Sequence, residues 1–119
     1  MHAISYSQDI DHLSLLLKAS HFIEFMEREY FQDFMEGNVC FGCGKDNPEG
    51  LQIKSYWEGE EAVCHWNSEE KYNGWKGLLN GGILATLIDC HCMCTAMAAV
   101  YKAENRGLTS VPIYRYATG

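Results

Sequence analysis

The segment 81–103 constrains the fold most, because it is apolar on nearly every side and rich in helix-forming residues. Asn80, a favoured N-cap residue, directly precedes it, and the Asn-Arg-Gly sequence at 105–107 is a typical stop signal. The pattern therefore predicts one long helix over 81–103. A helix that is apolar all round is buried on all sides, so other segments must wrap around it.

The segments available for this wrapping predict an α+β chain with few strands. Between 11 and 35, apolar residues recur every three or four positions, which predicts one or two amphipathic helices that serve in packing. Alternation in 51–57 and 62–66, around a turn at 58–60, predicts an antiparallel hairpin, whereas 40–50 and 69–77 are typical of loops. After Pro112 only 113–117 could form another strand, so the fold is expected to need more strands than these 119 residues hold.

Length and charge restrict the class of protein. A chain of 119 residues has room for one domain, and a net charge of −7 argues against a nucleic-acid partner. We identify no export signal and no segment that could span a bilayer, which predicts a cytoplasmic protein with no membrane partner. In that compartment the six cysteines are expected to be reduced thiols or metal ligands.

Asp89 is the first candidate for chemistry, because it is the only formally charged side chain between Gly77 and Lys102. A lone carboxylate on a buried helix is costly, and such groups often have raised pKa values that suit a general base. The other residues on its helical face are small and would let a second helix approach closely: Gly82, Ala85, Thr86, Cys92 and Ala96.

The start of the same helix is the second candidate. Free N–H groups at a helix N-terminus stabilise negative charge on a carbonyl oxygen, and Gly81 and Gly82 let a ligand approach the backbone. Asp89 lies eight residues from Gly81, about 12 Å along one helix at 1.5 Å per residue, too far for both to act on one carbonyl. The two groups must meet across antiparallel helices, which predicts a homodimer with shared sites.

Several short motifs between about 38 and 103 resemble those of the PaaI-type branch of the hotdog thioesterase superfamily, both in their order along the chain and in the spacing between them. The motifs are Cys40-Phe41-Gly42-Cys43-Gly44, Asn47-Pro48-Glu49-Gly50-Leu51, Gly77-Leu78-Leu79-Asn80-Gly81-Gly82 and Ala85-Thr86-Leu87-Ile88-Asp89. The resemblance implies a hotdog domain over 38–119, in which a curved antiparallel sheet wraps a central helix, preceded by a helical extension over 1–37. It also implies a homodimer or dimer of dimers that hydrolyses acyl-CoA thioesters without a cofactor.

The resemblance implies residue roles as well. The Gly81 N–H would polarise the thioester carbonyl, while Asp89 of the other subunit would activate water or attack directly. Asn80 stands where the family usually has histidine; asparagine can cap the helix and donate a hydrogen bond but cannot titrate near neutral pH. Gly82 is expected to contact substrate, and Tyr72 and Trp75, on the loop that enters the helix, are the better candidates for an acyl pocket.

The same residues can also be interpreted as purely structural. Asp89 could be a hydrogen-bonded core carboxylate and Asn80 a simple helix cap. Cys40 and Cys43 have ligand spacing, and further ligands could complete a zinc site: Cys64, His65, Cys90, His91, Cys92 and Cys94. Because residues two apart on a helix do not share a face, we favour buried thiols and expect no metal. The alternative functions are a non-catalytic acyl-CoA or lipid binder and a zinc-stabilised interaction module.

Overall fold

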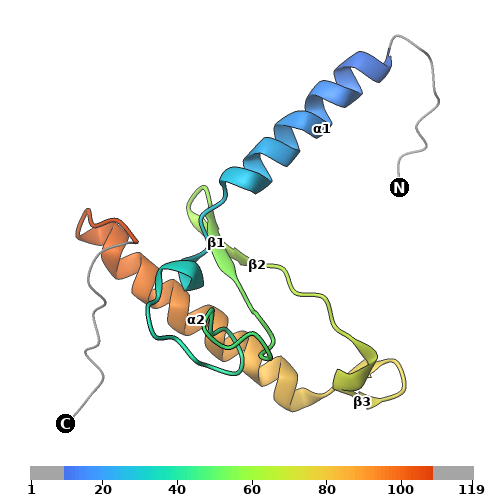
Figure 1. The fold of residues 1–119 in the computed structure, drawn as a ribbon, viewed down its shortest axis with the longest axis vertical. Coiled ribbons are helices and arrows are strands. Elements are labelled where there is room, and N and C mark those ends of the chain that lie inside the picture. Colours follow the sequence, from blue (N-terminus) through green and yellow to red (C-terminus); the bar gives the residue numbers. More distant parts are fainter. Residues whose placement is uncertain (1–9, 109–119) are drawn as a thin grey trace.

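A computed structural model describes residues 10–108 as a mixed α+β chain with two small antiparallel sheets and one long helix (Figure 1). The elements in chain order are α1 (Ile10–Glu27), η1 (Phe31–Phe34), β1 (Ser55–Glu58), β2 (Glu61–Cys64), η2 (Glu70–Tyr72), β3 (Asn73–Trp75), β4 (Leu78–Leu79) and α2 (Gly81–Ala103). The α+β class is confirmed. The strand expected over 113–117 lies outside the described residues.

Helix α2 has the predicted bounds, and its ends explain them. The Gly82 N–H donates a hydrogen bond of 2.7 Å to Oδ1 of Asn80, so the asparagine is the N-cap that the sequence predicts. At the other end, Asn105 adopts a left-handed conformation (φ 51°), and the Arg106 N–H donates to the carbonyl of Tyr101 at 2.8 Å. Both ends are set by residues next to the helix in the sequence.

The expectation that this helix is buried on all sides is wrong for the chain described. Its buried residues lie on one face: Cys90, Cys94, Ala98 and Tyr101. Other residues of the helix, Asp89 among them, are exposed, because η1, β1 and the loop after η1 pack against the face that carries the four buried residues (Figure 1). By length and composition α2 could also cross a membrane, which the sequence interpretation missed; core helices of soluble proteins pass the same test.

The predicted hairpin is confirmed but its strands are shorter. Ser55 pairs with Cys64 and Glu58 with Glu61 around a turn that contains Gly59 (φ 60°). The segment 51–54 is not a strand, because its backbone bonds to the preceding loop instead, with the Ile53 N–H donating to the carbonyl of Gly42 at 3.0 Å. The second hairpin, β3 with β4, falls partly in the segment 69–77 that was expected to be a loop throughout.

The core lies between η1, the loop 40–53 and the buried face of α2. Its members are Phe31, Cys43, Ile53, Cys90, Cys94 and Ala98. The expected packing role of the N-terminal segment therefore holds for η1. It does not hold for α1, which extends away from this core (Figure 1), with Leu15, Phe22 and Met26 exposed on the face predicted to pack.

Candidate functional site

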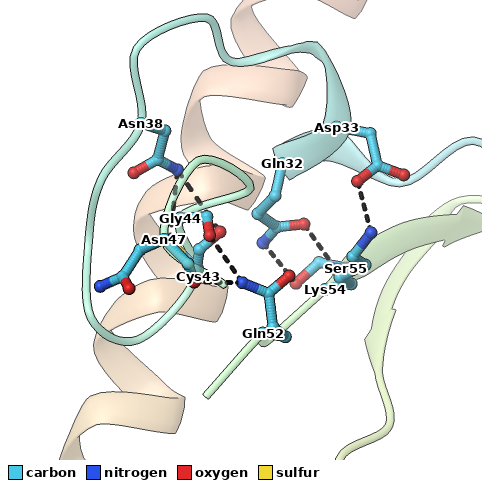
Figure 2. A network of polar contacts seen from close by, with 9 residues as sticks. All are labelled: Gln32, Asp33, Asn38, Cys43, Gly44, Asn47, Gln52, Lys54 and Ser55. Carbon is cyan, nitrogen blue, oxygen red and sulfur yellow. Dashed lines mark hydrogen bonds and ion pairs between the residues drawn. The ribbon is translucent and has the colours of Figure 1, made fainter. Parts of the chain in front are cut away.

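The loop after η1 is held in one compact conformation by its own polar groups. The Cys40 N–H donates to Oδ1 of Asn38 at 3.1 Å, and the Gly44 N–H donates to the carbonyl of Cys40 at 2.8 Å. The side-chain amide of Gln52 donates to the carbonyls of Gly44 (2.8 Å) and Asn47 (2.6 Å), as Figure 2 shows. These bonds close the loop without a regular element.

Gly42 is the point at which this loop meets α2. A Cβ atom at Gly42 would lie 2.6 Å from Sγ of Cys90 and 2.8 Å from Cγ2 of Thr86, closer than real Cβ contacts allow. Only glycine lets the loop backbone lie this close to the side chains of Cys90 and Thr86. The approach gathers four thiols, two from the loop and two from the helix: Cys40, Cys43, Cys90 and Cys94.

The sulfur atoms of these residues form a compact cluster. The Sγ atoms of Cys40 and Cys90 are 3.9 Å apart, as are those of Cys43 and Cys94. Those of Cys40, Cys43 and Cys90 all lie within 4.8 Å of one another. Cys40 is half-buried and the other three residues are buried.

Hydrogen bonds within the cluster shift the thiol pKa values in opposite directions. The bond with Cys94 is the main reason that the pKa of Cys43 lies well below its usual range. The same bond raises the pKa of Cys94, and burial followed by the nearby Cys43 charge raises the pKa of Cys90. The cluster thus favours one thiolate, at Cys43.

A cavity of about 510 Å³ opens beside this cluster and contains Asp89 in its lining. Its lining also includes the apolar side chains Met35, Val39, Met93 and Met97. Asp89 itself is exposed, which corrects the expectation of a buried carboxylate. Asp89 directly precedes the buried Cys90 and lies where the covered face of the helix borders the cavity.

The structure does not bring the two predicted half-sites, the start of α2 at Gly81 and the carboxylate of Asp89, together within one chain. Asn80, Gly81 and Gly82 are exposed at the start of α2, and a Cβ atom at Gly81 would meet nothing within 4 Å, so the backbone there is accessible. Asp89 lies farther along the same helix. Gly81 and Asp89 both belong to the one continuous helix Gly81–Ala103, so one chain cannot bring them to the same carbonyl.

The two candidate pocket aromatics do not line the cavity that contains Asp89. Tyr72 is half-buried, with its ring centroid 5.6 Å from that of Trp66, and its carbonyl accepts the Asn80 N–H at 2.9 Å. Trp75 is 80% exposed. Tyr72 therefore supports the start of α2, and Trp75 remains free to contact another molecule.

Sequence reasoning missed a buried polar network between η1, β1 and α2. Oγ of Ser55 lies 2.8 Å from Nδ1 of His91, and the Ser55 N–H donates to Oε1 of Gln32 at 2.7 Å (Figure 2 shows Gln32 and Ser55). Gln32 and Ser55 are fully buried. No local sequence signal links these residues, because they come from three separate elements.

The sequence analysis considered these four cysteines among possible zinc ligands but favoured separate buried thiols, although a signal for their clustering exists. Cys90 and Cys94 are four positions apart and therefore share a helical face. Cys92, two residues from each of them, does not share this face. Cys92 is exposed and lies outside the cluster.

The chain was compared with models of protein families, with curated proteins and with solved structures, and none of the three comparisons found a match. The resemblance to PaaI-type hotdog thioesterases therefore stays a prediction.

Proposed function

We propose that the chain is one subunit of a dimeric hotdog-fold thioesterase that hydrolyses an acyl-CoA. The observation that carries this proposal is the position of Asp89 in the lining of a cavity of about 510 Å³, whose other walls include the four cysteines and several apolar side chains. Ligand cavities typically measure about 300–1,000 Å³, with apolar walls and few polar groups. The methionines in the lining are adaptable side chains that suit an aliphatic acyl group.

The exposed face of α2 supports a site shared between two chains. Gly81 and Asp89 each lie four residues from Ala85, one before it and one after it. If two α2 helices cross antiparallel at Ala85, Gly81 of one chain lies opposite Asp89 of the other. All three residues are exposed, and glycine and alanine permit close approach of helices.

The proposed reaction divides its tasks between the two half-sites. The Gly81 N–H donates to the thioester carbonyl oxygen and stabilises the negative charge that develops there. The Asp89 carboxylate takes a proton from a water molecule, whose oxygen bonds to the carbonyl carbon. The C–S bond then breaks, the CoA thiolate leaves and is protonated, and the free acid remains. Oδ1 of Asn80 accepts a hydrogen bond from the Gly82 N–H and so stabilises the first turn of the helix.

Release of free thiol from a panel of acyl-CoA esters by the full chain tests this proposal. Asp89→Asn should lower kcat/KM by about a hundredfold or more, because general-base catalysis typically contributes that much. Glu49→Gln is the matched control, since it converts an exposed carboxylate on the loop to an amide and should retain activity. Full activity in Asp89→Asn would refute the assigned role.

A non-catalytic acyl-CoA or lipid binder is the second candidate. The observation that favours it is Asn80 at the helix start: its Oδ1 accepts the Gly82 N–H, and its amide Nδ2 can donate to a substrate but cannot exchange protons near neutral pH as histidine can. Such a protein would bind acyl-CoA in calorimetry without releasing thiol. Turnover that depends on Asp89 would exclude it.

A further inference from the structure

The cluster of four cysteines between the loop and α2 has the composition of a metal site. Cys40 and Cys43 are separated by two residues within a tight turn, and Cys90 and Cys94 lie one helical turn apart on the buried face of α2. Two such pairs facing each other supply four thiolate ligands, the set that structural zinc sites often use. We propose that these four residues bind one Zn²⁺ ion and thereby fix the loop to the helix.

The distances between the sulfur atoms fit this ion. Zinc binds thiolate sulfur at about 2.3 Å, so sulfur atoms at the corners of a tetrahedron around it lie about 3.8 Å apart. The Cys40–Cys90 and Cys43–Cys94 pairs are each at 3.9 Å, and Cys40, Cys43 and Cys90 lie within 4.8 Å of one another. Completing the tetrahedron requires Cys94 Sγ to move from its contact with Sδ of Met35 (3.8 Å) toward the other two thiols.

Polar groups around the cluster suit a site that carries negative charge. The Gly42 N–H points at Sγ of Cys40 at 3.3 Å, and the side-chain amide of Asn38 lies 3.7 Å from Sγ of Cys43. Hydrogen bonds of this kind orient metal ligands and tune their affinity. Gly42 admits no side chain between the loop and Cys90, so the ligand pairs are held face to face.

Four thiolate ligands would leave no open coordination position on the zinc, so the role of this site is structural. Metal binding would supply folding free energy to a chain whose buried core is small. This role does not depend on thioester hydrolysis, and either proposal can fail while the other holds.

Metal content and Co²⁺ spectroscopy of the full chain, purified under reducing conditions, test the proposal. We expect one zinc per chain, and replacement by Co²⁺ should give the intense visible absorption and thiolate charge-transfer bands of tetrahedral coordination. Cys43→Ser and Cys94→Ser should each weaken Zn²⁺ binding at least tenfold. Cys92→Ser is the matched control, because Cys92 is an exposed thiol on the same helix, and it should bind zinc as the unmodified chain does.

The spectrum of the unmodified chain keeps the test decisive if a serine variant does not fold. Failure of the reduced chain to bind Zn²⁺ or Co²⁺, a Co²⁺ spectrum without thiolate bands, or an equal loss of affinity in Cys92→Ser would each overturn the proposal. So would disulfides between Cys40 and Cys90 or Cys43 and Cys94 that form in preference to metal binding when the reduced chain is offered Zn²⁺ in air.

Discussion

The Sγ atoms of Cys43 and Cys94 lie 3.9 Å apart although 51 positions separate the two residues in the sequence. The contact joins an irregular loop to the buried face of α2, and it lies within the main cluster of buried residues. The loop is therefore part of the core, and changes at this junction should affect the stability of the whole described fold.

Gly42→Ala tests this junction. The added Cβ would lie 2.6 Å from Sγ of Cys90 and 2.8 Å from Cγ2 of Thr86, so the loop or these side chains must shift. We expect a loss of about 1–3 kcal/mol in the free energy of unfolding, measured with urea. Gly81→Ala is the control, because a Cβ there meets nothing within 4 Å; an equal loss in that variant would contradict the assigned cause.

Asn80→Ala tests the start of α2. The change removes the acceptor for the Gly82 N–H, whose bond to Oδ1 of Asn80 measures 2.7 Å, and should cost about 1 kcal/mol in thermal or urea unfolding. Asn80→Asp should keep the cap, and its negative charge suits a helix N-terminus. Similar losses in the two variants would show that Asn80 contributes through something other than capping.

Cys64 provides a pH-dependent prediction. Burial is the main cause that raises the pKa of its thiol, so the folded chain keeps the proton at pH values where an unfolded chain begins to lose it. The contribution of Cys64 to stability is therefore present below about pH 8.5, the ordinary thiol pKa, and is lost as the pH rises further. Peptide mapping after iodoacetamide treatment should show slower labelling of Cys64 at pH 8 in the folded chain than in urea. Equal rates would contradict this.

The parts of the fold that the sequence predicts well depend on neighbouring residues. The bounds of α2 follow from Asn80 at one end and Asn105 at the other, and the β1–β2 hairpin follows from alternation around Gly59. The second hairpin escaped prediction because its strands, Asn73–Trp75 and Leu78–Leu79, are too short for a periodic pattern.

The parts that the sequence did not predict depend on distant contacts. Periodicity showed that α2 is apolar but could not show which face other elements cover, so Asp89 was expected to be buried and is exposed. The thiol cluster likewise requires the loop to fold back on the helix at Gly42, and this approach has no local signature. The i, i+4 spacing of Cys90 and Cys94 indicated half of the cluster at most.

The exposed face of α2 leads to a prediction about assembly. Ala85 and Ala96 are exposed on the side of the helix that carries Asp89, as are the larger apolar residues Met93 and Val100. An uncovered apolar surface of this kind favours association, and an antiparallel helix pair that crosses at Ala85 would bury it. The chain should therefore be a dimer at micromolar concentration in analytical ultracentrifugation. Ala85→Arg should weaken the dimer at least tenfold, because it places two like charges at the crossing point.

Asn67→Arg is the control for added charge, since Asn67 is exposed in the loop after β2 and does not belong to α2. It should leave the dimer intact. Circular dichroism of both variants would show whether the monomer keeps its helix content. A monomeric unmodified chain, or a dimer that tolerates arginine at position 85, would rule out the antiparallel arrangement and with it the shared site of Gly81 and Asp89.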